Sequence, residues 1–187
     1  MVENGFTVRA AKSSEMDGVA ELLSLTFMED PVSRWLFPDE KRRRQVHPEF
    51  FSAFAGFAFD HGDVRVTSDF SGAVLWIPGG RRDLVDRFAA LTGDERKRFD
   101  ALAELREANE PSSPHLQAQC LGVLPRRRGA GIGAALLRQR QDVPVYVEAS
   151  SAAGAALCRG LGFETGKTFG VEGGPELVSM LRQVGSL

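Results

Sequence analysis

Residues 125–137, PRRRGAGIGAALL, combine positively charged side chains with several glycines, which have no side chain. Three arginines precede glycines at positions 129, 131 and 133, and an apolar run typical of a helix follows. The first N–H groups of a helix lack partners within it, and the helix dipole adds about half a positive charge there. Glycines let a ligand approach those groups without meeting a Cβ atom. The segment therefore predicts a site for an anion such as a pyrophosphate.

Two other phosphate-binding loops can be tested by spacing. A Walker loop would need a glycine at position 161, five residues before the GKT of residues 166–168, but leucine stands there and no helical pattern follows. A dinucleotide-binding loop, which would indicate an oxidoreductase that uses NAD, matches GAGIGA at residues 129–134. That loop normally follows the first strand of a domain, whereas this one lies far into the chain. A glycine-rich turn with solvated arginines is the remaining alternative.

The segments around this loop predict neighbouring parallel strands. HLQAQCLGV, at residues 115–123, alternates as a strand does, and VPVYVEAS, at residues 143–150, is the apolar run of a strand buried on both faces. A short helix from Gly133 connects them, and a strand, helix and strand in succession favour a parallel pair.

The rest of the chain also divides into strand and helix patterns. Residues 28–40 have the composition of a loop, Asp39 can cap the helix that follows, and Pro48 is expected to break or restart that helix. Phenylalanines at 50, 54 and 57 share one helical face, which indicates core packing. The other predicted elements are a strand at 6–11, a helix at 12–27, a hairpin at 63–68 and 72–78, two surface helices within 81–109, a helix at 151–162 and a closing hairpin at 163–171 and 176–184.

LGVLPRRRGAGIGAALL, at residues 121–137, resembles the acetyl-CoA-binding segment of the GNAT superfamily of N-acetyltransferases, whose hallmark is Arg or Gln, two residues, Gly, one residue, then Gly or Ala. Arg128, Gly131 and Gly133 occupy those positions. The resemblance extends to PVYVEASSAAGAALCRGLGF and to the order of the elements, although only residues 116–163 are specific. It implies one domain, residues 1–187, with an α/β (α+β) fold: a mixed, mostly antiparallel sheet of about seven strands with a splayed parallel pair and flanking helices.

The resemblance also implies how a coenzyme binds and reacts. The backbone of residues 121–123 would pair with the pantetheine arm of acetyl-CoA, and N–H groups from Gly129 to Ala134 would hold the pyrophosphate. An amine would attack the thioester directly, and an amide near Leu121 would stabilise the oxyanion that develops. The implied coenzyme-binding residues are Leu121, Gly122, Val123, Arg126, Arg128, Gly129, Ala130, Gly131, Ile132, Gly133, Ala134, Ser151 and Cys158.

Two of these positions depart from many relatives, which have an asparagine at the head of the following helix and a tyrosine seven residues later that protonates the departing thiolate. This chain has Ser151 and Cys158 there. Expelling a thiolate with a pKa near 8.5 at pH 7 costs only about 2 kcal/mol, so activity can survive this change. Cys158 could donate the proton or be inert packing. The sequence does not choose a general base among Glu29, Asp30, His115 and Glu148.

The sequence indicates the site of the acceptor amine less clearly than the coenzyme site. Candidates to line it are Asp30, Trp35, Trp76 and Tyr146, with Phe37 a further aromatic residue, and core packing is the alternative for the aromatic ones. The two helices within residues 81–109 are expected to wall the acceptor pocket. The predicted function is transfer of an acetyl group from acetyl-CoA to a primary amine of a small molecule or polypeptide. A non-catalytic acyl-CoA-binding or sensing module is the alternative.

The composition limits the class of protein. The chain has 187 residues and a formal charge of −2, so KRRR at residues 41–44 is expected to be a solvated helix face and no nucleic acid is expected as a partner. No apolar run is long enough for a membrane span, and the start lacks the pattern of a secretory signal, which favours the cytoplasm. Two scattered cysteines predict reduced thiols and no metal site. We expect a monomer or a homodimer.

Overall fold

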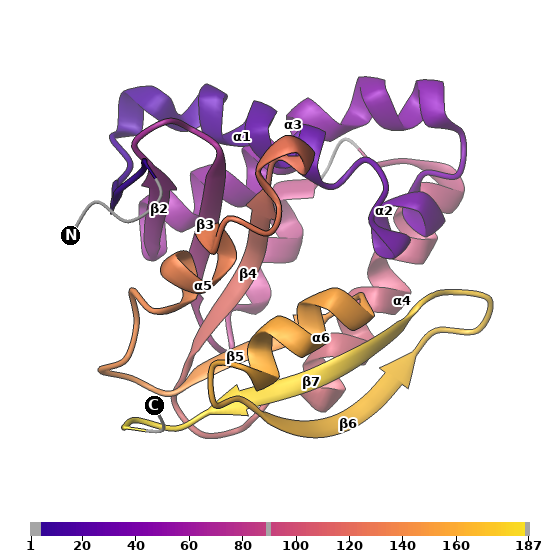
Figure 1. Ribbon diagram of the computed structural model, residues 1–187. Helices are drawn as coiled ribbons and strands as arrows, with labels where there is room; N and C mark the ends of the chain where they lie inside the picture. Colours follow the sequence, from indigo (N-terminus) through magenta and orange to yellow (C-terminus); the bar gives the residue numbers. More distant parts are fainter. Residues whose placement is uncertain (1–4, 89–90, 186–187) are drawn as a thin grey trace.

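The computed structural model describes residues 5–88 and 91–185, which build a seven-stranded sheet flanked by helices (Figure 1). The strands lie in the order β1-β2-β3-β4-β5-β7-β6. Their bounds are β1 (Val8–Ala10), β2 (Asp63–Thr67), β3 (Gly72–Pro78), β4 (Leu116–Val123), β5 (Val145–Ala149), β6 (Glu164–Gly170) and β7 (Glu176–Arg182). The α-helices are α1 (Met16–Thr26), α2 (Pro31–Leu36), α3 (Glu40–His61), α4 (Gly93–Asn109), α5 (Ile132–Leu137) and α6 (Ala152–Arg159). Short 3-10 helices are η1 (Ser13–Glu15), η2 (Arg82–Phe88) and η3 (Pro125–Arg127).

The sheet is antiparallel except where β4 meets β5. These two strands run parallel and are paired at Leu116 with Val145 and at Gln117 with Tyr146. Beyond these residues they diverge, and Figure 1 shows the gap between them, which we call the splay. The mixed sheet with one splayed parallel pair and flanking helices, as predicted, is confirmed.

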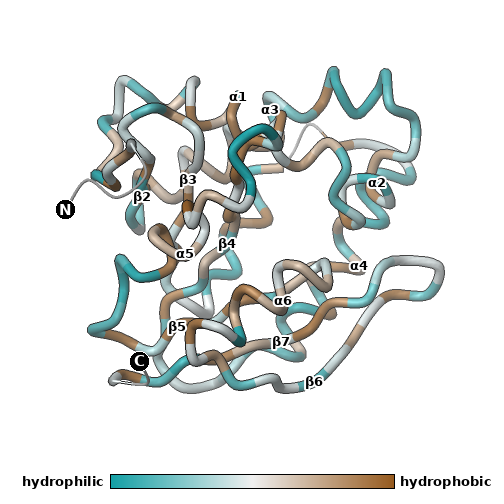
Figure 2. The backbone as a smooth tube through the Cα atoms, viewed as in Figure 1, coloured by the Kyte–Doolittle hydropathy of each residue, from teal (hydrophilic) through white to brown (hydrophobic). Residues whose placement is uncertain are grey.

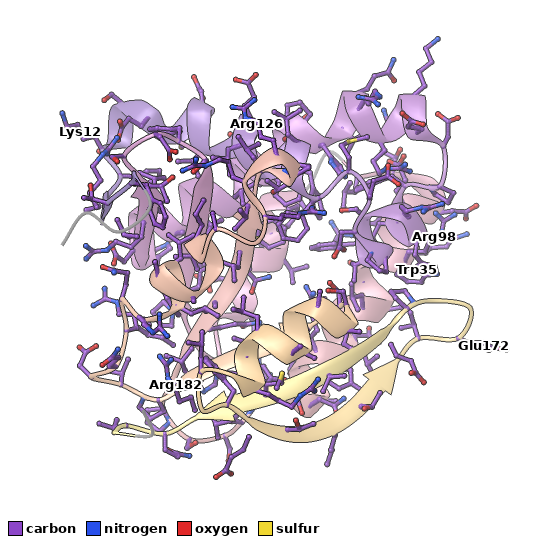
Figure 3. All side chains as sticks on the ribbon, in the orientation of Figure 1. Lys12, Trp35, Arg98, Arg126, Glu172 and Arg182 are labelled. Carbon is purple, nitrogen blue, oxygen red and sulfur yellow. The ribbon has the colours of Figure 1, made fainter. Side chains whose placement is uncertain are left out.

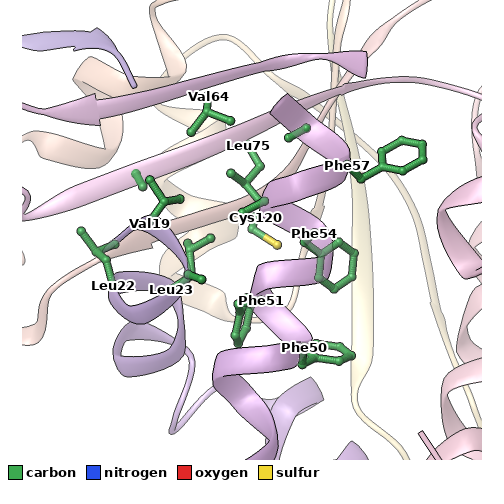
Figure 4. Close-up of a cluster of buried hydrophobic side chains, with 14 of the residues drawn as sticks. Val19, Leu22, Leu23, Phe50, Phe51, Phe54, Phe57, Val64, Leu75 and Cys120 are labelled. Atoms are coloured by element: carbon green, nitrogen blue, oxygen red, sulfur yellow. The ribbon is translucent and has the colours of Figure 1, made fainter. Parts of the chain in front are cut away.

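Two hydrophobic clusters cover the two faces of the sheet. In the first, α1 and α3 pack against β2, β3 and β4, and the phenylalanines of α3 stand beside Leu23, Leu75 and Cys120 (Figure 4). Phe50, Phe54 and Phe57 are all buried there, so their predicted core packing is confirmed. In the second cluster, residues of α5 and α6 cover the opposite face. None of the helices in the described part of the chain is both long and apolar enough to cross a membrane.

Three local predictions need correction. The α3 helix continues through Pro48 to His61, because the residues on both sides of the proline are held in the first cluster. The predicted loop at residues 28–40 contains α2, whose first amides bond to the Asp30 carboxylate and whose first residue is a proline. The first of the two helices predicted within residues 81–109 is the 3-10 helix η2 rather than an α-helix.

Candidate active site

A β-bulge in β4 lies where the splay opens. Ala118 and Cys120 pair with adjacent residues of β3, so Gln119 between them has no partner in that strand. Backbone groups along a strand face its two neighbours alternately, and one extra residue shifts this alternation by one position for the residues that follow. The bulge therefore decides which amides of β4 remain available to the splay.

The amides that follow the bulge can be assigned from the ladder. Leu124 donates its N–H to the carbonyl of Ser71, which precedes β3, at 2.9 Å. Because an antiparallel ladder alternates, we infer that the amides of Leu121 and Val123 face away from β3 and into the splay. These are the backbone groups that the sequence predicted to contact the coenzyme, and that role stays a prediction.

The loop before α5 holds two glycines in the left-handed conformation. Gly129 has a φ of +83° and Gly131, the N-cap of α5, has a φ of +78°. A Cβ atom at either position would meet open space. Ala135 donates to the carbonyl of Gly131 at 3.0 Å and so closes the first turn, which leaves the amides of residues 132–134 directed out of the helix end.

The three arginines before this loop lie in different surroundings. Figure 2 shows the segment as strongly hydrophilic, and Arg126 is exposed at its tip (Figure 3). Arg127 pairs with Asp69 of the β2–β3 turn, with 3.0 Å between Nη2 and Oδ2. Arg128 Nη2 lies 3.5 Å from the carbonyl oxygen of Thr26. Arg127 is therefore held by an ion pair that fixes the loop to the sheet, whereas Arg126 is exposed.

A pocket of about 350 Å³ opens beside the splay on the face that carries α3. Its outer wall consists of η2 and α4, where the sequence predicted that two helices would wall a pocket. The apolar part of its lining consists of Phe54, Leu84, Val85, Phe99, Leu102 and Ala103. This lining suits the apolar body of a small molecule.

The strands of the splay form the inner end of the pocket. Gln117 and Tyr146 are paired, and Gln119 and Glu148 lie two residues further along the same strands. Both Gln119 and Glu148 line the pocket. The pocket and the splay therefore meet where β4 and β5 begin to separate.

Glu148 is a buried carboxylate with a cation beside it. Its side chain is 3% exposed, and its Oε2 lies 2.7 Å from Nε of Arg106 in α4. The hydroxyl of Tyr146 donates to Oε1 at 3.3 Å. Burial raises the pKa of Glu148 above its ordinary value, and the charge of Arg106 and the hydroxyl of Tyr146 only partly offset this. Glu148 is therefore a stronger base than an exposed glutamate.

The other candidate bases lie in less suitable surroundings. Glu29 is exposed and 3.6 Å from the equally exposed Arg34. His115 lies 3.2 Å from Glu110, and the Ser113 carbonyl accepts from its Nδ1 at 2.8 Å. Both nitrogens of this ring face oxygens, whereas Glu148 lies at the inner end of the pocket.

The charges that line the pocket favour a cation over an anion. Each of its three arginines forms an ion pair with a carboxylate. Five carboxylates line the pocket with these arginines, namely Asp100, Glu104, Glu107, Glu110 and Glu148. Two of them also have partners outside the lining, since Asp100 pairs with Arg96 and Glu110 with His115. An entering ammonium group is attracted by this excess of negative charge.

The whole architecture has counterparts among solved structures, although no protein-family model matches the chain. A structure described as histone acetyltransferase HPA2 and related acetyltransferase from Corynebacterium glutamicum has a TM-score of 0.71 at 24% identity, over 96% of both chains. An agmatine N-acetyltransferase has a TM-score of 0.70 at 18% identity, over 95% of this chain and 99% of its own. The polyamine N-acetyltransferase of Drosophila melanogaster, which forms N-acetylagmatine, has a TM-score of 0.61 at 17% identity with the same coverage. This is the GNAT fold.

Ser151 lies just before α6 of the GNAT fold, and Cys158 lies within that helix. Ser151 is the N-cap, and its Oγ accepts from the amide of Gly154 at 3.1 Å. Cys158 is 2% exposed within the second cluster, and burial raises the pKa of its thiol to about 11. A buried thiol of this pKa stays protonated at pH 7 and is a poor acid toward a departing thiolate, which favours the packing role over proton donation.

Two aromatic residues expected at the acceptor site belong to the core. Trp76 is fully buried in the second cluster and does not line the pocket, as the core-packing alternative has it. Phe37 is 1% exposed in the first cluster. In a strand buried on both faces the sequence does not show which side a tryptophan takes, and the alternation of β3 turns Trp76 toward α5 and α6.

The remaining acceptor candidates do not line the pocket. Asp30 caps α2 with Oδ1 and accepts from the Ser150 hydroxyl with Oδ2 at 2.6 Å, so both oxygens are engaged. Trp35 lies beside Arg98, which donates to its carbonyl, and its ring packs against the β6–β7 turn (Figure 3). Tyr146 is 1% exposed and reaches the site only through its bond to Glu148. Asp30 and Trp35 therefore do not line this pocket, and their role toward the acceptor stays a prediction.

Proposed function

We propose that the protein is an N-acetyltransferase that transfers an acetyl group from acetyl-CoA to a primary amine of a small molecule or polypeptide. The observation that carries the proposal is that the pocket ends at Gln119 and Glu148, where the splay begins. A thioester held in the splay would lie next to an amine held in the pocket, so that direct attack is possible. The GNAT fold, shared with N-acetyltransferases, supports the same function.

The residues around the splay fit acetyl-CoA. The amide of Val123, which faces into the splay, suits an extended pantetheine arm, which would add to β4 as a strand does. This leaves the amide of Leu121 for the acetyl oxygen. A pyrophosphate would suit the start of α5, where the amides point out of the helix and the two left-handed glycines leave open space. The exposed side chains of Arg126 and Arg128 add positive charge beside it. When bound, acetyl-CoA supplies an acetyl group activated as a thioester.

Two groups of the protein serve the transfer itself. An amine enters as an ammonium ion at pH 7 and must lose a proton before its nitrogen can attack, and Glu148 accepts that proton at the inner end of the pocket. The amide of Leu121 donates to the acetyl oxygen as negative charge develops there, an effect worth about 3–4 kcal/mol in other enzymes.

The departing thiolate needs no acid from the protein. At pH 7 a thiolate with a pKa near 8.5 leaves at a cost of only about 2 kcal/mol relative to the thiol. Cys158 is buried and holds its proton tightly. Solvent therefore protonates the thiolate after it leaves. Solvent also takes the second proton, which the nitrogen loses as the amide forms.

Replacing Cys158 with alanine is expected to leave kcat within about twofold of the unchanged protein. The variant loses about 1 kcal/mol of stability because a small buried side chain is trimmed. The rate of thiol release and the Tm measure the two effects. Cys120→Ala, which trims the buried thiol of the first cluster, is the matched control. A tenfold fall in kcat for Cys158→Ala alone would instead make this thiol the proton donor.

The acceptor is an amine that is cationic in solution, as the excess of carboxylates around the pocket favours. Related folds include enzymes named for agmatine, polyamines and arylalkylamines. The apolar lining suits the body of such small molecules, and a polypeptide amine that reaches in as an extended side chain remains within the proposal. The cytoplasmic location, the single domain and the monomeric or homodimeric state remain predictions.

A thiol-release assay over a broad panel of amines, with acetyl-CoA as donor, tests the function. We expect release that saturates with one class of cationic amine, and a higher Tm with CoA but not with NAD. Tight binding of CoA without turnover on any amine would favour the sensing module over the enzyme. A Tm raised by NAD alone would favour an oxidoreductase.

A further inference from the structure

Arg106 brings a positive charge to the inner end of the pocket from α4, a helix outside the sheet. Its side chain is 26% exposed, whereas the Glu148 side chain that it contacts is 3% exposed. We propose that Arg106 is a positioning residue, whose guanidinium holds the Glu148 carboxylate charged and oriented at the inner end of the pocket. This inference rests on the proposed function and assigns α4 a part in proton acceptance as well as in shaping the pocket.

The groups that face Glu148 leave Arg106 as its counterion. From β5, Tyr146 contributes a neutral hydroxyl, and the β4 side chains in the pocket are glutamines. From α4 and its end come Arg106 and Glu110. Glu110 is itself engaged by His115 at 3.2 Å and by the amide of Gly80 at 2.8 Å. The positive charge of Arg106 is therefore available to Glu148.

The geometry of the pair leaves hydrogen-bonding capacity unused at two buried atoms. Arg106 Nε and Glu148 Oε2 are 2.7 Å apart, yet within the described residues neither atom has an aligned hydrogen-bond partner. The contact thus acts mainly through charge, and Oε2 keeps its capacity to accept a hydrogen bond.

Burial makes the counterion necessary. A carboxylate removed from water tends to bind a proton, and a protonated Glu148 cannot accept another from the acceptor. An opposite charge in contact favours the ionised form by about 1–3 pH units. Without Arg106, Glu148 would stay protonated to a higher pH. Below that pH it could not accept a proton from the acceptor amine.

Carboxyl NMR titration tests this without any turnover. Protein labelled with ¹³C at glutamate carboxyls is titrated, and Glu148→Gln identifies the signal of Glu148. In Arg106→Gln and Arg106→Met, the second of which keeps part of the aliphatic stem, the midpoint is expected to rise by at least about one pH unit. Arg106→Lys should restore most of the original midpoint. Arg82→Gln is the matched control, because Arg82 also lines the pocket and pairs with a carboxylate of α4 but is 77% exposed.

Kinetics add a second measurement in the same variants. With an accepted amine, the acidic limb of the pH profile of kcat/KM should move upward with the NMR midpoint in Arg106→Gln and stay in place in Arg82→Gln. If Arg106 only stabilises the fold or the pocket, its variants should instead lower the Tm or raise KM, and the acidic limb of the pH profile should not move. Unchanged Glu148 midpoints in folded Arg106→Gln and Arg106→Met overturn the inference. Absence of turnover on any amine contradicts the proposed function but leaves the NMR result decisive for Arg106.

Discussion

Replacing Glu148 with glutamine lowers kcat/KM for the best amine about 10²–10⁴-fold at pH 7, while CoA binds with unchanged affinity. The substitution keeps the size of the side chain and removes its ability to accept a proton. The bond from Tyr146 survives because the amide oxygen still accepts, although the charge that pairs with Arg106 is lost. Rates of thiol release across pH measure the effect, and the variant should recover as the pH approaches the pKa of the acceptor amine.

Two further variants separate proton acceptance from general damage to the pocket. Glu107→Gln removes another carboxylate from the same lining, one that pairs with Arg82, and should change kcat/KM by no more than a few-fold. Glu148→Asp keeps the charge but withdraws it by one methylene group, so an intermediate rate is expected. Equal losses in Glu148→Gln and Glu107→Gln would mean that the pocket requires negative charge and no particular base.

The parts of the fold that were predictable are those with local causes. The left-handed glycine before α5 needs only its own backbone and the helix after it, so PRRRGAGIGAALL predicted this turn and the start of a helix. The hairpin of β2 and β3 and the cap at Asp39 are equally local. The missed helix α2 had a local signal too, since aspartate followed by proline is a common helix start.

The parts of the site that escaped prediction depend on distant contacts. The bulge at Gln119 exists because β3 and β4 change register there, and neither strand shows this alone. Arg106 belongs to a helix with many surface charges and meets Glu148 only through the packing of α4 over the sheet. A weak signal was present, because Phe99, Leu102 and Arg106 recur at the spacing of one helical face, and the first two are buried.

Distant contacts also explain why Asp30, a predicted acceptor residue, does not line the pocket. Asp30 has the charge to bind an amine, but its neighbours in the chain and Ser150 of a distant loop occupy both of its oxygens. Residue type and proximity to a motif indicate that a side chain is capable of a contact. The partners that the fold supplies decide whether the side chain is free to make it.

Replacing Gly131 with valine is expected to weaken CoA binding about 10–100-fold, as follows from the loss of one or two hydrogen bonds to a charged group. A side chain with a branched Cβ does not tolerate a φ of +78°, and the left-handed region costs an ordinary residue about 1–2 kcal/mol. The backbone escapes this strain by rotating, which turns the first amides of α5 away from the pyrophosphate. Titration calorimetry with CoA measures the affinity, and thermal unfolding measures the loss of stability.

Gly173 supplies the matched control. It has a φ of +71° in the β6–β7 turn and, like Gly131, faces open space, so Gly173→Val introduces the same strain away from the splay. Its Tm should fall by a similar amount while its Kd for CoA stays within about twofold of the unchanged protein. If the two variants lose CoA affinity equally, the loss at Gly131 reflects general instability. If neither loses it, the coenzyme binds elsewhere, and the alignment of thioester and pocket on which the proposed function depends is wrong.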